Sequence, residues 1–194
     1  MILPIYLYGS QVLREKAAEA DLDEREELTK LLEDMYETMK NADGCGLAAP
    51  QVGRSLRVLI VDGSDLADRY PELADFIRRM INPVFTFKSE EMCTYCEGCL
   101  SIPNIDADIE RPKVVRIKYI DENFREKEEE FDGFAARMLQ HEMDHLDGVV
   151  FTDRAAPIRK KMLGSKLNNI SKETSRHLTG SKQTNYSYGS ISRL

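Results

Sequence analysis

One run of five residues, His141-Glu142-Met143-Asp144-His145, has the types and spacing that metal chemistry requires. It matches the H-E-x-x-H pattern, in which histidines four positions apart share one helix face and can reach the same metal ion. The glutamate lies about 100° further round the helix, where it can reach a metal-bound water without ligating the metal. The chain has only three histidines, so chance is a weak explanation. A pair of surface histidines beside acidic residues is the plain alternative.

A catalytic site of this kind needs a third protein ligand and keeps one position for water. Glu173 is the only glutamate after the motif, and it lies in a polar stretch, so a downstream carboxylate ligand is not expected. Upstream, Cys93, Cys96 and Cys99 form a C-x-x-C-x-x-C run, and Cys45 lies between two glycines. Cysteines at this spacing can also hold zinc or begin an iron–sulfur motif. Spacing alone does not decide which cysteine joins the histidines.

The motif requires a helix, and the flanking residues predict one between Asp132 and Gly148. Asp132 can cap its start, and Gly148 can adopt the left-handed conformation past its end. Met138 and Phe134 lie about one and two turns before the first histidine and share its face. The helix is therefore expected to bury the face that carries the histidines.

Hydrophobic periodicity predicts the remaining elements. Apolar residues at helical spacing indicate a helix around residues 28–39, with Asp23 as its N-cap. A short helix is expected within 69–80, an amphipathic helix at 157–167 and an extended segment at 149–152. Branched apolar residues and alternation predict strands at residues 57–61, 81–87, 113–120 and 124–131. Together these elements predict an α+β fold in which antiparallel strands pack around a central helix that carries the H-E-x-x-H motif.

The composition is typical of one ordinary globular domain. The chain has 194 residues, of which 42% are hydrophobic and 31% charged, and its formal net charge is −7. An acidic balance argues against specific DNA binding, which needs a basic surface, and no apolar run is long enough for a membrane span. The first residues lack the basic start of a signal peptide. A reducing, cytoplasmic location is therefore expected, where cysteines are thiols or metal ligands.

Three segments together resemble the motifs of the peptide deformylase family. They are Gly44–Gln51 (GCGLAAPQ), Glu97–Ser101 (EGCLS) and Gln140–Gly148 (QHEMDHLDG), and they occur in the family's order. The resemblance runs from Leu3 to about Asp153. Because the sequence becomes rich in Ser, Thr, Asn, Lys and Gly from residue 171, we expect a catalytic domain at residues 1–170 and a loosely held polar tail at 171–194.

The resemblance implies both the ligands and the reaction. It makes Cys99, His141 and His145 the ligands of one divalent metal ion, which in this family is typically ferrous iron, with zinc, nickel or cobalt as alternatives. Cys93 and Cys96 lie outside the motif and are expected to be incidental thiols. The implied activity is removal of the formyl group from the N-terminal formyl-methionine of nascent polypeptides. Formate is released after a metal-bound hydroxide attacks the formyl carbon.

Residue chemistry, together with the resemblance for Leu100, also assigns roles to residues that do not bind the metal. Glu142 is the expected general acid and base, and the Gln51 amide with the Leu100 backbone N–H is expected to stabilise the oxyanion. Gly46 lets the loop backbone approach the substrate closely and is expected to hydrogen-bond the peptide backbone, although it could also serve only the turn after the first helix. Glu97 is expected to support the site without reacting.

The sequence indicates the methionine pocket and the cellular partners less directly than the metal ligands. Phe134 and Met138 are candidates for an apolar methionine pocket, although a core role is equally compatible with their positions. The basic residues 159–161 could make a weak contact with the ribosome, although a solvated helix face is the plain interpretation. Two other functions stay open on the sequence: an H-E-x-x-H metallo-endopeptidase, and a non-enzymatic metal-binding module built on the cysteine run.

Overall fold

The computed structural model describes residues 1–178, with side chains through residue 176. Short 3-10 turns cover Gln11–Arg14, Ala49–Val52, Ser64–Leu66 and Pro71–Leu73. The helices are α1 (Arg25–Asn41), α2 (Gly133–Leu146), α3 (Phe151–Arg154) and α4 (Pro157–Leu178). The strands are β1 (Gly46–Ala48), β2 (Val58–Asp62), β3 (Ile77–Lys88), β4 (Met92–Cys99), β5 (Ile102–Pro112), β6 (Val115–Ile120) and β7 (Glu126–Phe131).

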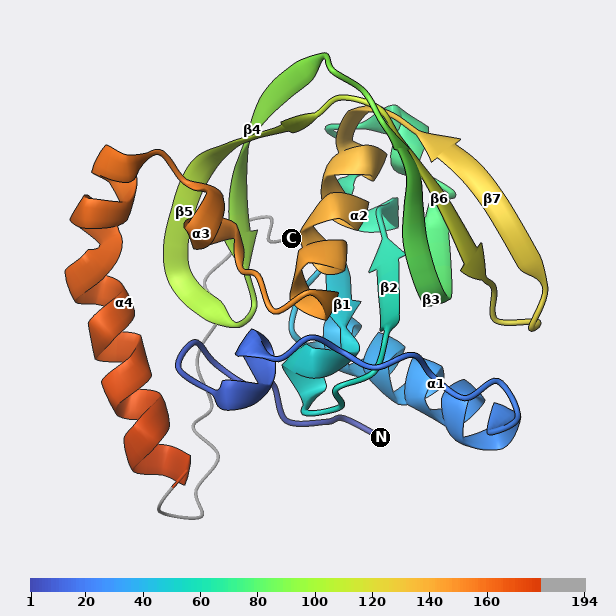
Figure 1. Cartoon of the computed structure of the whole chain (residues 1–194), viewed down its shortest axis with the longest axis horizontal. Helices are drawn as coiled ribbons and strands as arrows, with labels where there is room; N and C mark the ends of the chain where they lie inside the picture. The colour runs from blue at the N-terminus through green and yellow to red at the C-terminus, as the bar shows by residue number, and fades with distance from the viewer. Residues whose placement is uncertain (179–194) are drawn as a thin grey trace.

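Two antiparallel sheets lie on either side of α2 (Figure 1). Five strands form one sheet in the order β1-β2-β3-β6-β7, and β4 and β5 form a separate long hairpin. Helix α2 packs on β1 and β2. Its Arg137 and His141 side chains form hydrogen bonds with strand β4 of the hairpin. Helix α1 packs on the first sheet, and α4 lies along β5. The expected α+β fold around a central helix is confirmed.

Amphipathic patterning explains why α1 and α2 form where they do. The buried face of α1 carries apolar residues at helical spacing from Leu28 to Met39, as expected. In α2 nearly every residue after Gly133 is buried, because sheets cover it on two sides. Gly148 has φ +71° and ends the helix as predicted.

The expected N-caps were wrong in detail. Asp132 occupies the N-cap position of α2, but its side chain makes no capping hydrogen bond. The N-cap position of α1 is occupied by Glu24, not Asp23. Packing against the sheets therefore stabilises both helices without the side-chain caps that the sequence suggested.

Two segments differ from expectation in conformation. Residues 69–80 hold only the 3-10 turn at Pro71–Leu73 before β3 begins. The segment 149–152 was expected to be extended, but α3 begins at Phe151, where the Asp153 carboxylate accepts the Val150 N–H at 3.0 Å. That bond satisfies a backbone donor at the start of the helix, and so favours the turn over an extended chain.

The expected boundary between residues 170 and 171 falls inside α4. Leu163, Leu167, Ile170 and Thr174 form one buried stripe at helical spacing, which the polar composition conceals. The Thr174 hydroxyl donates to the Tyr8 carbonyl at 3.0 Å. Residues 171–176 are thus packed helix rather than a loose tail, and residues 179–194 lie outside the described part.

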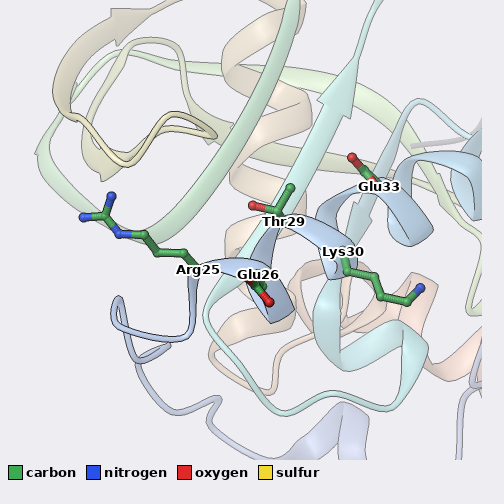
Figure 2. A pocket seen from close by; sticks show the side chains of 5 residues that line it. All are labelled: Arg25, Glu26, Thr29, Lys30 and Glu33. Atoms are coloured by element: carbon green, nitrogen blue, oxygen red, sulfur yellow. The ribbon is translucent and has the colours of Figure 1, made fainter.

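One surface pocket lies away from the three sequence motifs. This pocket on the outer face of α1 is lined by charged and hydroxyl side chains of that one helix, none of them in the three motifs (Figure 2). Those side chains are Arg25, Glu26, Thr29, Lys30 and Glu33.

Among the described helices, none is long and apolar enough to cross a membrane.

Candidate active site

Cys99, His141 and His145 meet inside the protein. Cys99 is the last residue of β4, and the histidines lie one turn apart on α2. Their ligand atoms all lie within 4.8 Å of one another, and all three side chains are buried. Cys99 Sγ is 3.3 Å from His145 Nε2. This is the one such cluster of potential metal ligands among residues 1–176.

The orientation of His141 suits a cation. Its Nδ1 lies 2.9 Å from the carboxylate of Glu97, which fixes the ring. The opposite nitrogen, Nε2, is buried and finds no hydrogen-bond partner in the described structure. A buried polar atom without a partner is costly, whereas a metal ion would satisfy it. One thiolate and two imidazoles suit zinc, ferrous iron, cobalt or nickel, so the residues present fit a divalent metal.

A network of buried ion pairs supports His141 through Glu97. Burial alone would raise the pKa of Glu97, but hydrogen bonds from Arg111 and His141 hold that pKa well below its usual range. Arg111 also donates to Asp144, which the half-exposed Arg154 contacts through two further hydrogen bonds. The expected support role of Glu97 stays a prediction, although its contact with His141 agrees with it.

Glu142 lies beside the cluster but does not join it. Its side chain is buried, and Oε2 has no hydrogen-bond partner within the described residues. Burial raises the pKa of Glu142 to about 7. A carboxylate that titrates near neutral pH is suited to take up and release a proton.

Gly46 leaves the space that this carboxylate occupies. A Cβ added at Gly46 would lie 2.3 Å from Glu142 Oε1 and 2.9 Å from its carboxyl carbon. The glycine is therefore required by the close approach of Glu142 as well as by any contact with substrate. Sequence spacing gave no signal of this contact, because 96 positions separate the two residues.

Gly46→Ala should accordingly displace Glu142 while leaving the backbone in place. We expect a large fall in turnover with a smaller loss of stability, about 1–3 kcal/mol as for other overpacked interiors. Gly164→Ala is the matched control, because a Cβ there meets nothing within 4 Å and the residue lies in α4. Kinetic assays and thermal unfolding of both variants would check this, and normal turnover by the Gly46 variant would contradict it.

Gln51 is held so that its amide nitrogen faces the cluster. Its Oε1 accepts the Ala48 N–H at 2.8 Å, while Nε2 lies 3.2 Å from Ser101 Oγ and 3.5 Å from Cys99 Sγ. One amide proton is thus directed toward the serine and the other toward the metal-ligand cluster. Leu100 is fully buried directly after Cys99, so its backbone lies at the same site.

Phe134 and Met138 are both buried, and the structure places them in the main core cluster. The Phe134 ring stacks on Tyr70 with centroids 4.4 Å apart and meets Tyr95 edge-on at 5.4 Å. Their proposed contact with the methionine side chain stays a prediction.

Three further residues contact the site but have no role predicted from the sequence: Arg111, Arg137 and Ser101, which lies in the EGCLS motif. Arg137 left a signal, since an arginine one turn before His141 lies on the helix face that is expected to be buried. Cys93 and Cys96 lie on β4 and are half-buried and exposed respectively, outside the cluster. The cysteine run therefore does not form a metal site of its own among the described residues.

These features together are those of metal-dependent hydrolases built on an H-E-x-x-H helix. The family model for polypeptide deformylase matches residues 2–161. A peptide deformylase of Cytophaga hutchinsonii is 44% identical over 172 residues, covering 89% of this chain and 92% of the relative. One from Fusobacterium nucleatum is 42% identical over 177 residues, covering 91% and 97%. The crystal structure of the peptide deformylase from Thermus thermophilus matches with a TM-score of 0.79 and 38% identity, covering 89% of this chain and 99% of that one.

The chain belongs to the peptide deformylase family. It is an enzyme, a hydrolase that removes the formyl group from the N-terminal formyl-methionine of nascent polypeptides. The endopeptidase and the non-enzymatic metal module are set aside by this membership.

Proposed function

We propose that Cys99, His141 and His145 hold one divalent ion, ferrous iron in the cell, with zinc, nickel or cobalt able to replace it. The observation that carries this proposal is the buried cluster of three ligand atoms, in which His141 Nε2 has no other partner among the described residues. When bound there, such an ion lowers the pKa of a coordinated water toward neutrality and polarises the formyl oxygen.

Glu142 moves the proton in this scheme. Its Oε2 makes no hydrogen bond within the described residues, so it accepts a proton as the water oxygen bonds to the formyl carbon. The same proton then passes to the nitrogen of the methionine as the carbon–nitrogen bond breaks. Formate and a free amino terminus result, and Glu142 is again ionised.

Gln51 and Leu100 stabilise the negative charge that develops on the formyl oxygen. The Gln51 amide is fixed at both ends by Ala48 and Ser101, and its remaining N–H points toward Cys99 Sγ in the metal-ligand cluster. The backbone N–H of Leu100 is the second donor. Preorganised donors of this kind act mainly on the transition state.

Gln51→Leu should therefore lower kcat by about 10²–10³-fold with little change in KM. Ser101→Ala keeps the amide but removes one of its anchors, so its loss should be smaller. Steady-state kinetics on a formyl-methionyl peptide would test both variants. An unchanged kcat in the leucine variant would exclude Gln51 as an oxyanion donor.

The peptide is proposed to add to the edge of β1. This strand pairs with β2 on one side and is the terminal strand of its sheet in the described structure. The backbone of Gly46 on this strand lies against Glu142, so an extended peptide bonded there would bring its formyl end to the carboxylate. Phe134 and Met138, in the earlier turns of the helix that carries Glu142, are the proposed apolar contacts of the methionine.

The remaining proposals concern the cellular setting. Formyl-methionyl chains emerge from ribosomes, so we place the enzyme in the cytoplasm with nascent chains as its partners. Lys160 and Lys161 are exposed near the start of α4 and are the proposed weak ribosome contact, whereas Arg159 bonds the Asp106 carbonyl of β5.

Formate release tests the function directly. Protein loaded anaerobically with ferrous iron is given a formyl-methionyl tripeptide, the same peptide acetylated, and an unblocked longer peptide. Rapid formate release from the first substrate, with the other two left intact, is the expected result. Cleavage inside the longer peptide without formate release would instead indicate an endopeptidase.

A further inference from the structure

Arg137 is a buried charge that the proposed reaction does not use. It lies one helical turn before His141 on α2, and its side chain is 0% exposed. Placing a guanidinium in the interior is costly unless it is paired and fully hydrogen-bonded. Its two terminal nitrogens are hydrogen-bonded, whereas Nε is buried without a partner among the described residues.

The guanidinium ties α2 to both strands of the β4–β5 hairpin. Its Nη1 donates to Glu97 Oε1 at 2.6 Å and to the Ile109 carbonyl at 2.9 Å. Its Nη2 donates to the Cys93 carbonyl at 2.7 Å. The Tyr95 ring lies 5.1 Å from the guanidinium carbon. One side chain therefore fixes the hairpin relative to the helix that carries the histidines.

The carboxylate of Glu97 is the point where this arrangement meets the site. Its Oε1 accepts from Arg137 and from Arg111 Nε at 2.6 Å. Its Oε2 accepts from Arg111 Nη2 at 2.9 Å and lies 2.9 Å from His141 Nδ1. With Oε1 fixed by two guanidinium groups, the carboxylate cannot rotate without breaking a buried ion pair. Oε2 therefore stays directed at the histidine.

Arg111 holds Glu97 through two nitrogens, but it lies on β5 and not on the helix that carries His141. It is shared between two carboxylates, because its Nη1 donates to Asp144 at 2.7 Å. Asp144 in turn bonds Arg154, which is half-exposed. Arg137 contacts Glu97 as its one carboxylate partner in the described structure, and it lies on the same helix as His141. It thus sets the carboxylate relative to that helix.

We propose that Arg137 is a positioning residue that acts through Glu97 to hold the His141 ring with Nε2 facing Cys99 and His145. The inference deepens the proposed function and rests on its metal site. Outer partners of metal-bound histidines fix ring orientation, and their loss typically lowers metal affinity or activity by about 10–100-fold.

Cobalt provides the test, because its visible spectrum reports the geometry of the bound ligands independently of turnover. The full chain is loaded with cobalt(II), and the spectrum, the rate of metal release to a chelator, and the thermal midpoint are recorded. The variants are Arg137→Met and Arg137→Lys, with Arg154→Met as the matched control. The control removes a guanidinium from the same network without touching Glu97.

We expect Arg137→Met to change the cobalt bands and to speed metal release about tenfold or more. Arg137→Lys should be intermediate, since an ammonium can reach Glu97 but not the Cys93 and Ile109 carbonyls as well. The control should lower the thermal midpoint and leave the spectrum unchanged.

One outcome would contradict a positioning role for Arg137. If the Arg137 variants lose stability but keep the wild-type spectrum and release rate, Arg137 serves only the packing of the hairpin. Should the methionine variant fail to fold, the lysine variant decides by the same criterion. Wild-type protein that binds no cobalt, or shows no thiolate-to-cobalt band, would overturn the metal site itself before any Arg137 comparison.

Discussion

Glu142→Gln should lower formate release by about 10²–10⁴-fold, the usual contribution of a general acid and base, while metal content stays at the wild-type level. Glutamine has the shape of glutamate, so it fits the space beside Gly46, where a Cβ would lie 2.3 Å from the carboxylate oxygen. It cannot accept a proton, so the attacking water would not be activated. Single-turnover formate assays, together with metal analysis of the same samples, would measure both quantities.

The interpretation depends on comparing two substitutions at this position. Glu142→Ala removes the same proton acceptor but leaves a cavity in a buried site. Both variants should lose activity to a similar extent and keep the metal, because Glu142 lies outside the ligand cluster. Loss of metal from the glutamine variant would show that Glu142 is a ligand, and would contradict the role assigned to it.

Cys99→Ser should weaken binding of zinc or cobalt by about 100-fold or more, beyond the loss typical of outer partners. A hydroxyl is a harder and poorer ligand than a thiolate for these ions. Cys99 is buried with its Sγ 3.3 Å from His145 Nε2, and no further potential ligand among residues 1–176 joins this cluster. Competition with a chelator of known affinity gives the dissociation constant.

Cys96→Ser is the matched control, since it makes the same change three residues earlier on β4 at an exposed position. Its metal affinity should equal that of the wild type. Equal affinities for all three proteins would remove Cys99 from the ligand set. A loss confined to the Cys96 variant would restore the cysteine run as the metal site.

The sequence predicted those parts of the fold that depend on local periodicity. The buried stripe of α1 and the alternation of β6 could be recognised directly, and both elements lie where they were expected. In β5 the same alternation occurs, although no strand is predicted there: Ile105, Ala107 and Ile109 are buried, and the polar residues between them are exposed. The end of α4 is not predictable from periodicity, because its buried stripe has only one residue per turn in a polar background.

The metal-ligand cluster was predictable for a different reason. The two histidines are neighbours through helical geometry alone, whereas Cys99 came from motif resemblance, because no local rule brings a strand end to a helix 42 positions later. The contacts among Glu97, Arg111 and Arg137 depend on hairpin register and helix docking. The pairing of β4 with β5 sets that register, and sequence spacing does not reveal it.

Gly46 illustrates the same limit. Its position in a motif was visible in the sequence, and a contact with substrate was the natural interpretation. The approach of Glu142 adds a steric requirement that depends on how β1 packs against α2. Only a three-dimensional structure can supply that relation.

X-ray absorption at the metal edge tests the central claim most directly. For zinc-loaded wild-type protein, we predict one sulfur at about 2.3 Å and two imidazole nitrogens at about 2.0–2.1 Å, with one light atom from water completing a four-coordinate site. The sulfur contribution should disappear in Cys99→Ser and persist in Cys96→Ser. A first shell without sulfur, or with several sulfurs, would contradict the assignment of Cys99, His141 and His145 as the metal ligands.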